Sequence, residues 1–326
     1  MKRLGPWLLA LVVLSAVAFA MGSYQNDVYR KLLLWITLAL GYNFLFGIAG
    51  QVAFSHFSFY GLGAYSVVIG ITYLGWPLPL AILASAVFCM VVALLVAIPA
   101  TRLEGFYLAL ATLAFAQLFI VLLNEGGQVT GGTGGLANYR LPDIAGFRIT
   151  GPAYTVVIVL LMLSTLAILL RLDRSHFGRA CRAARDNPEA AAAMGVDVRR
   201  TRILAYTLTS TLAGFAGMVY AFVDNTVNPT IFGLENVFLL LFMIIIGGIG
   251  RAAGAVLGAV LLYLLPFVLS PLIGHHHALV FGLVMVLVVL FQPKGLMGLW
   301  DALVARRNPV RPVNGAPGPQ QVQPRV

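Results

Sequence analysis

The chain has 326 residues, of which 60% are hydrophobic and 10% are charged, and its formal net charge is +10. Soluble domains carry about a quarter charged residues. With a mean hydropathy of +0.93, this composition excludes a soluble globular enzyme, a disordered protein and a nucleic-acid-binding domain. It predicts an all-α, polytopic membrane protein.

Stretches without Asp, Glu, Lys or Arg locate the predicted spans, because a charge at the bilayer centre costs about 2.5 to 3.5 kcal/mol on insertion scales. The charge-free intervals are 4–26, 32–101, 105–124, 149–170, 203–223, 236–250 and 252–293. A spanning helix needs about 20 residues. The interval 32–101 therefore has room for three helices, with breaks near Gly50-Gln51 and Gly75-Trp76-Pro77. The interval 252–293 has room for two, with a break around Gly274–His277. We expect about ten spans, of which 236–250 is short or partly re-entrant.

Three regions divide the chain. Residues 1–30 are predicted to form an N-terminal transmembrane anchor. Lys2-Arg3, the apolar run and the small-x-small tripeptide Ala18-Phe19-Ala20 also fit a secretory signal peptide, so cleavage is an alternative. Residues 31–307 are assigned to the main transmembrane domain. The segment 308–326 has five prolines and no apolar period, and we expect it to be disordered.

The basic residues predict the orientation. If the N-terminus is cytoplasmic and ten spans alternate, 17 of the 21 Lys and Arg residues lie on the cytoplasmic side. The outer side then keeps Arg30, Lys31, Arg140 and Arg148. This is a strong positive-inside bias, so both termini are predicted to be cytoplasmic. The bias also explains the positive charge without a nucleic-acid partner.

The predicted cytoplasmic loop 171–202 contains eight arginines and is expected to form two short helices. Ser175 is the expected N-cap of the first helix. The second starts with an Asn-Pro-Glu sequence, continues through alanines and stops at a glycine, a pattern typical of a capped helix. Such a helix suits a groove on another protein, and the alternative is a solvated basic loop that only sets topology. The residues assigned to this docking helix are Asn187, Pro188, Glu189, Ala190, Ala191 and Gly195.

The predicted outer loop 124–152 contains eight glycines, including those of the run Thr130–Gly135. No Gly-Lys-Ser/Thr follows the run, which excludes a phosphate-binding loop. We interpret the segment as a flexible outer loop. The alternative is a gate or a docking surface for an external partner.

Two sets of residues within the spans have a predicted role. Glycines at helical spacing allow helices to approach closely in lipid, and those assigned to helix packing are Gly214, Gly217, Gly247, Gly250, Gly254 and Gly258. A polar stretch follows the second span. Polar groups at membrane depth face a bundle interior or a water-filled path. These side chains therefore either hydrogen-bond between helices or line a pathway with neutral dipoles, and they are Asn43, Gln51, Ser55, His56 and Ser58.

No catalytic, metal or cofactor site is predicted. Consecutive histidines such as His275-His276-His277 point in different directions on a helix, and the spacing of Cys89 and Cys181 fits neither a metal nor a disulfide. The carboxylates of Asp224 and Glu235 flank the outer ends of spans, whereas ion-coupled carriers usually place a charge near the midplane. An ion-coupled carrier is therefore only a distant alternative. The chain also lacks a Gly-x-x-x-x-Gly-Lys-Ser/Thr motif, so it is not expected to hydrolyse ATP itself.

Several blocks, in order, resemble the permeases of branched-chain amino acid ABC importers of the LivM type. They are Gly50-Gln51-Val52 through Ser55-His56 with Tyr60–Tyr65, Leu103–Ala109, Thr130-Gly131-Gly132 with Gly135-Leu136, Ser175–Ala180, Arg185–Gly195, Ala213–Gly217 and Gly247–Gly258. The resemblance covers roughly residues 30–300. The loop resembles the family's "EAA" motif, which contacts the ATPase subunit. It departs from the general motif at Ile203-Leu204-Ala205, where the usual proline is missing.

The resemblance implies a complex in a bacterial inner membrane. This chain would pair with a second homologous permease as a heterodimer, and two ATP-binding cassette subunits would use ATP-Mg at the cytoplasmic face. A periplasmic or extracellular binding protein would deliver the cargo. Leucine, isoleucine and valine are the expected cargo, and urea or another small amide or acid is the alternative. The chain itself is expected to bind no cofactor and no nucleic acid, and its remaining contacts are with membrane lipid.

Overall fold

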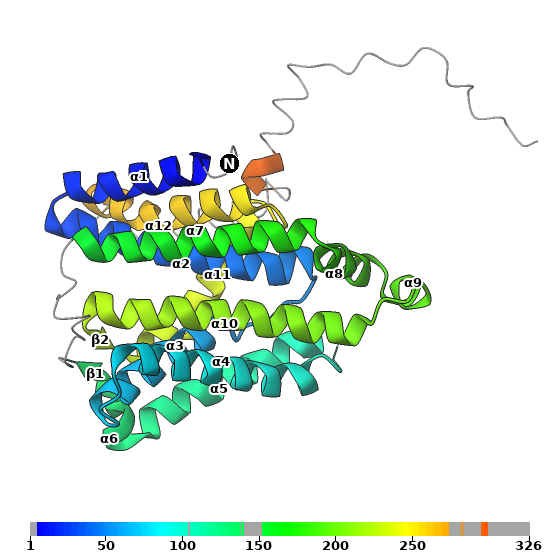
Figure 1. The fold of residues 1–326 in the computed structure, drawn as a ribbon, viewed down its shortest axis with the longest axis horizontal. Helices are drawn as coiled ribbons and strands as arrows, with labels where there is room; N and C mark the ends of the chain where they lie inside the picture. Colours follow the sequence, from blue (N-terminus) through cyan, green and yellow to red (C-terminus); the bar gives the residue numbers. More distant parts are fainter. Residues whose placement is uncertain are drawn as a thin grey trace, which may run out of the picture.

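A computed structural model describes residues 5–103, 105–137, 139, 152–273, 282 and 295–298 of the chain (Figure 1). The long helices are α1 (Gly5–Ala20), α2 (Ser23–Asn43), α3 (His56–Thr72), α4 (Leu78–Ala100), α5 (Phe106–Glu125), α7 (Pro152–Arg174), α10 (Val198–Asp224), α11 (Leu234–Gly247) and α12 (Ala252–Ile273). The shorter elements are η1 (Phe44–Ile48), α6 (Gly127–Thr130), η2 (Gly132–Gly134), β1 (Leu136–Ala137), α8 (His176–Asp186), α9 (Pro188–Ala193), β2 (Thr226–Val227) and η3 (Pro229–Phe232). The segment 308–326, His275–His277 and the break expected there lie outside the described residues.

The predicted all-α membrane class is confirmed. Five helical segments within the described residues are long and apolar enough to cross a membrane: Ser23–Ile48, Leu78–Ala100, Phe106–Glu125, Ala153–Arg174 and Val198–Asp224. The apolar helices α11 and α12 lie alongside them (Figure 1). Both breaks predicted inside 32–101 are present, since α2 and η1 end before Gly50 and α3 ends before Gly75. The total of about ten spans stays a prediction.

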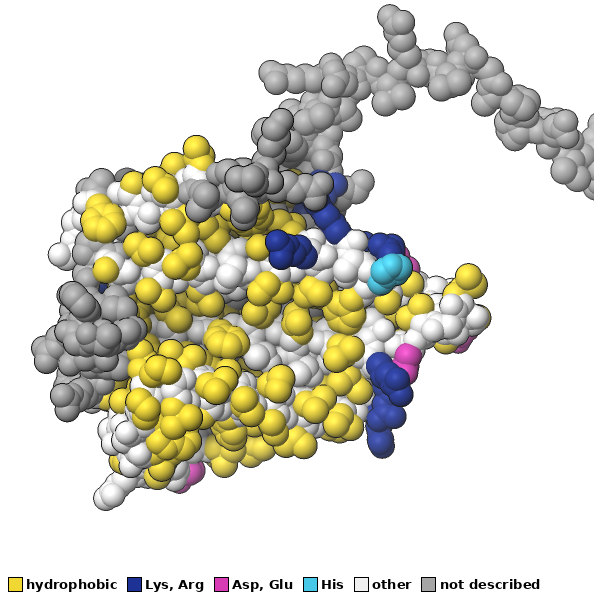
Figure 2. Space-filling view, viewed as in Figure 1, with side chains coloured by type: hydrophobic (Ala, Val, Ile, Leu, Met, Phe, Trp, Pro, Cys, Tyr) yellow, Lys and Arg dark blue, Asp and Glu magenta, His cyan; other side chains and the backbone are white. Residues whose placement is uncertain are grey.

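The bundle is built around α2 and α10. Helix α10 packs against α3, α4 and α2, and α2 also packs against α7, α12 and α11. In contrast, α4 and α5 keep many large apolar side chains exposed along their length, and Figure 2 shows this apolar face. An apolar face of this extent is what a helix needs where it meets lipid or another membrane subunit.

Glycines bring several of these helices into backbone contact. A Cβ atom added at Gly217 of α10 would overlap the backbone oxygen of Tyr60 in α3, and one added at Gly63 would overlap Gly214. At the α11–α12 contact, a Cβ added at Gly258 would overlap the backbone of α11. The helices therefore approach more closely than any side chain at these positions would allow.

Residues 127–137, expected within a flexible outer loop, have regular local structure. They form α6, η2 and β1, and β1 pairs antiparallel with β2, just beyond the end of α10. Gly131 and Gly135 have φ angles of 74° and 71°, which only glycine adopts at little cost. The glycine run thus permits tight turns that cover this end of the bundle.

Candidate functional site

A cavity of about 350 Å³ opens between α2, α3, α10, α11, α12 and η3. Its lining is mostly aromatic and aliphatic, with a few polar side chains. Ligand pockets typically measure about 300–1,000 Å³ and have this mixed lining. The cavity is therefore the first candidate for a small-molecule site among the described residues.

The lining residues of helix α2 show how far the cavity extends along the bundle. Lys31, Trp35 and Leu38 all line it, and their spacing of four and three residues places them on one face of the helix. At 1.5 Å per residue, Leu38 lies about 10 Å further along the helix than Lys31. By the predicted orientation Lys31 is near the outer surface, so the cavity extends from that surface toward the middle of the bundle.

An ion pair lies at the Lys31 end of this lining. The Lys31 Nζ atom is 3.0 Å from Oδ2 of Asp224, the last residue of α10, and the two side chains are 39% and 23% exposed. The hydroxyl of Tyr220, one turn earlier on α10, donates to the same carboxylate oxygen at 3.2 Å. The pair joins the two central helices across the cavity.

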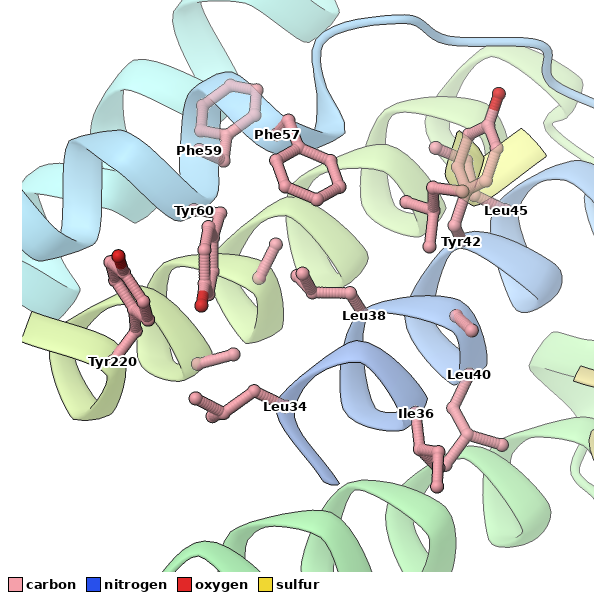
Figure 3. Packing of buried hydrophobic residues seen from close by; sticks show 14 of the residues in the cluster. Leu34, Ile36, Leu38, Leu40, Tyr42, Leu45, Phe57, Phe59, Tyr60 and Tyr220 are labelled. Carbon is pink, nitrogen blue, oxygen red and sulfur yellow. The ribbon is translucent and has the colours of Figure 1, made fainter. Parts of the chain in front are cut away.

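Aromatic rings form the deeper wall. The rings of Trp35 and Phe57 have centroids 4.9 Å apart, and those of Tyr60 and Tyr220 are 5.3 Å apart. Figure 3 shows Phe57 and Tyr60 of α3 directed toward Leu38 of α2, with Tyr220 beside Tyr60. These pairs give a rigid apolar surface below the ion pair.

The predicted pathway residues lie elsewhere in the bundle. All five are at most 3% exposed, and none of them lines the large cavity. Ser55 Oγ is 2.5 Å from the hydroxyl of Tyr206, and Gln51 Nε2 donates to the backbone oxygen of Arg202 at 3.1 Å. The two alternatives for these residues, helix packing and pathway lining, therefore both remain predictions.

The other three members of this polar set differ in their contacts. Asn43 Oδ1 accepts from Gly250 N at 2.8 Å and borders a small cavity of about 30 Å³. The His56 ring lies 5.4 Å from that of Tyr42, centroid to centroid. The buried hydroxyl of Ser58 has no hydrogen-bond partner in the part of the chain that the structure describes. In the sequence, His56 and Ser58 flank Phe57, which lines the large cavity.

The charged pair of the cavity was not predicted as a site. From the sequence, Lys31 marks only the outer end of a span, and so does Asp224. The spacing of Lys31, Trp35 and Leu38 is a helical face that could have been noticed. Its meeting with α10, almost two hundred residues later, depends on tertiary packing that no local pattern carries.

The predicted helix caps of the loop 171–202 are confirmed. The Ser175 side chain accepts from Phe177 N and Gly178 N, and the Asn187 side chain accepts from Ala190 N. Helix α9 begins with Pro188 at its first position, and Gly195 just after it has a φ angle of 85°. Because asparagine and proline fix the start and glycine permits the left-handed end, this short helix is specified locally.

Helix α9 projects from one end of the bundle (Figure 1). Ala191 faces inward and is buried, whereas the side chains of Glu189 and Met194 are exposed, Met194 to 85%. Figure 2 shows apolar atoms at this tip and Lys and Arg side chains behind it. The docking role of the helix remains a prediction.

Helix α8 connects α9 to the transmembrane helices through two arginines. Arg182 donates to the side chain and the backbone oxygen of Asp173, near the end of α7. Arg185 donates to the backbone oxygen of Gly47 in η1, and its methylene groups occupy the space that a Cβ at Gly50 would need. A displacement of α8 would therefore act on α7 and on η1 together.

The η1 segment is a wide π-helical turn that continues α2. Ala49 N donates to Phe44 O and Gln51 N to Leu45 O, both at 3.0 Å. π turns inside helices often occur at functional sites. A Cβ at Gly47 would also overlap Gly250, so η1 contacts the α11–α12 connection as well as α8.

Metal and thiol chemistry find no support in the described part of the chain. No group of three His, Cys, Asp or Glu side chains there could hold a metal ion. Cys89 and Cys181 are unpaired and buried. Burial raises the pKa of the Cys181 thiol to about 11, which its neighbour Arg182 only partly offsets, so little reactive thiolate forms at neutral pH.

Fold and site thus define a multi-pass α-helical membrane protein with a cavity near one end and a helical projection at the opposite end. A family model described as the permease component of branched-chain amino acid transport systems matches residues 26–289. The chain belongs to this family. The sequence resemblance to LivM-type permeases is thereby confirmed.

Individual relatives agree with the family. The chain is 29% identical to the high-affinity branched-chain amino acid transport system permease protein LivM of Escherichia coli, over 89% of this chain and 74% of that protein. It is 25% identical to the permease protein BraD of Pseudomonas aeruginosa and 25% to LivH of Escherichia coli, in each case over 80% of this chain and 90% of the relative. No solved structure matches the chain.

Proposed function

We propose that this chain is the transmembrane permease subunit of an ATP-driven importer that carries leucine, isoleucine and valine across a bacterial inner membrane. The family match over residues 26–289 is the observation that carries the proposal. The relatives named LivM, LivH and BraD are all permease proteins of branched-chain amino acid transport systems.

The chain works within a complex. Because LivM and LivH of Escherichia coli are both similar to it, the second permease is a homologue and the pair is a heterodimer. Two ATP-binding cassette subunits bind ATP-Mg on the cytoplasmic side, and a periplasmic binding protein delivers the amino acid. This chain contributes the pathway, and its partners perform the hydrolysis.

Coupling runs through α9. Its exposed alanines and Met194 enter a groove of an ATPase subunit, and closure of the ATPases displaces α9 and α8 as one unit. Arg182 transmits this displacement to α7 and Arg185 transmits it to η1, the inner end of α2. Helix α2 therefore moves relative to α10, and these are the two helices on either side of the cavity.

The amino acid enters the cavity from the outside and leaves through the polar set below it. Asn43, Gln51, Ser55, His56 and Ser58 are buried in this state, so the inner half of the path is closed. Neutral polar groups suit this segment because they solvate a passing zwitterion without holding it. The inner half opens when the ATPase subunits move α8.

The alternative within the same family is a permease for urea or another small amide or acid. The two functions differ in the solute that the cavity favours. An aromatic and aliphatic cavity favours a cargo with an apolar side chain. An ion-coupled carrier remains a distant alternative, with no midplane carboxylate in the sequence to support it.

Cargo competition in reconstituted vesicles tests the proposal. The complete complex, with its binding protein outside and ATP inside, is supplied with labelled leucine. We expect uptake that unlabelled isoleucine and valine suppress and excess urea leaves unchanged. Uptake of labelled urea but not of leucine would reject the cargo and retain the permease.

A further inference from the structure

We infer that Lys31 and Asp224 are the recognition site for the zwitterionic backbone of the transported amino acid. Lys31 binds the carboxylate, Asp224 binds the ammonium group, and the side chain points into the aromatic part of the cavity. This inference rests on the proposed function and deepens it, because neither the family match nor the relatives assign these residues.

The location of the two charges is the first argument. Each of the two charged side chains lies at the end of an apolar span, yet both line the cavity. Lys31 follows two turns of α2 and lies on the same face as Trp35 and Leu38, and all three border one cavity. A lysine needed only for topology has no reason to face a cavity rather than the headgroups.

The pairing of the charges is the second argument. The Lys31 ammonium and the Asp224 carboxylate are 3.0 Å apart and partly exposed. A zwitterion replaces this one ion pair with two, since its carboxylate pairs with Lys31 and its ammonium pairs with Asp224. No charge is left unpaired at any stage, so entry of the amino acid avoids the penalty for burying a lone charge.

Tyr220 holds the acidic half of the site. Its hydroxyl donates to Asp224 Oδ2 at 3.2 Å and fixes the carboxylate from within the same helix. Such a bond orients the carboxylate for an incoming ammonium group. Tyr220 is a positioning residue in this site.

The shape of the cavity is the third argument. Beyond the ion pair the lining is mostly aromatic and aliphatic and includes Trp35, Leu38 and Phe57, with Asn236 as a neutral polar member. A branched aliphatic side chain attached to a zwitterion anchored at Lys31 and Asp224 points into this region. A neutral solute such as urea gains nothing from a pair of opposite charges and has no group to fill the apolar part.

Charge-removal variants of the complete reconstituted complex test the inference. Uptake of labelled leucine at limiting concentration is measured for Lys31→Met, Asp224→Asn and the double variant, and ATP hydrolysis stimulated by the loaded binding protein is measured in parallel. We expect each variant to lose uptake by about tenfold or more. Stimulated hydrolysis should stay within about twofold of wild type, because α8 and α9 are untouched.

The double variant separates recognition from a purely structural ion pair. If the pair only joins α2 to α10, removing both charges leaves none unpaired and uptake returns to the wild-type level, which would overturn the inference. We expect no such recovery. Glu235→Gln is the matched control, because Glu235 is exposed and does not line the cavity. Its uptake should equal that of wild type.

A direct binding measurement keeps Lys31 and Asp224 in place. Its result therefore does not depend on whether the charge-removal variants fold. Trp35 is made the sole tryptophan by the substitutions Trp7→Phe, Trp76→Phe and Trp300→Phe, and its emission is recorded in the complex without binding protein. Leucine should change the emission, whereas 4-methylpentanoate and isopentylamine, which each lack one charge, should not. Equal responses to all three would overturn the inference. If the wild-type complex takes up no leucine at all, the proposed function has failed instead.

Discussion

Gly217 allows helices α10 and α3 to approach closely, because glycine has a hydrogen atom in place of a side chain. Its Cα lies so close to α3 that a Cβ would overlap the backbone oxygen of Tyr60. Backbone cannot rotate away as a flexible side chain can, so any larger residue must push α3 and α10 apart. That contact also supports the cavity, since Tyr60 and Tyr220 line it from these two helices.

Gly217→Ala should therefore lower stability, although alanine alone favours a helix by up to about 1 kcal/mol over glycine. Overpacking costs about 1–3 kcal/mol, and we expect the midpoint of thermal unfolding in detergent to fall. Gly134→Ala is the control, because nothing lies within 4 Å of its added Cβ, and its midpoint should not change. An unchanged midpoint for Gly217→Ala would mean that α3 and α10 are not in backbone contact.

At this scale the sequence reveals some roles and hides others. Asn187, Pro188 and Gly195 could be assigned from the chain alone, because a cap depends on neighbours within a few residues. Lys31 and Asp224 could not be paired, because their contact requires α2 and α10 to pack side by side. Charge counting explains where Lys31 lies along its helix, but not which way it faces.

At the scale of elements, α9 is a short helix that projects from the bundle with an apolar tip. Met194→Glu places a charge on the most exposed apolar side chain of this region, which is 85% exposed. If α9 enters a groove of an ATPase subunit, that charge would be buried without a partner. We expect the ATPase subunits recovered with the tagged permease to drop at least about tenfold, which corresponds to about 1.4 kcal/mol.

Val129→Glu is the matched control for this experiment. Val129 is 52% exposed on α6, at the other end of the bundle. The same charge there should leave the ATPase subunits bound. Full recovery of the ATPases with Met194→Glu, together with normal uptake, would show that α9 is not the docking helix.

Helix α8 is the proposed link between docking and the pathway, and Arg185 is its contact with η1. Arg185→Gln removes the charged donor to Gly47 O but leaves α9 unchanged. We expect the ATPases to remain bound and to hydrolyse ATP, while leucine uptake per ATP hydrolysed falls about fivefold or more, since such a contact is worth on the order of 1.5–3 kcal/mol.

Arg179→Gln provides the comparison on the same helix, because Arg179 is exposed and donates to the nearby Arg174 O rather than to η1. Its ratio of uptake to hydrolysis should match wild type. A normal ratio for Arg185→Gln would contradict the role of η1 in coupling.

The elements themselves were largely predictable. Charge-free intervals identify α2, α4, α5, α7 and α10 because lipid excludes charge from any span, a requirement that acts on each segment separately. The structured part of the outer loop was not predicted. Its glycines are equally compatible with flexibility and with tight turns, and only the pairing of β1 with β2 distinguishes the two.

At the scale of the whole molecule, the two ends have different chemistry. One end carries the short strands and the ion pair at the end of α10, and the other carries α8, α9 and most of the described arginines (Figure 1). Helix α2 runs between them, with Lys31 near one end and η1 at the other. A displacement at the α8–α9 end can therefore reach the cavity through a single helix.

The energy source is the most direct test of this account. Membrane vesicles that contain the complete complex are loaded either with ATP or with a buffer that sets up a proton gradient, and uptake of labelled leucine is measured with the binding protein outside. We predict uptake with internal ATP and none with the gradient alone. Leucine uptake that follows the proton gradient in the absence of ATP would contradict the assignment of this chain as an ABC importer permease.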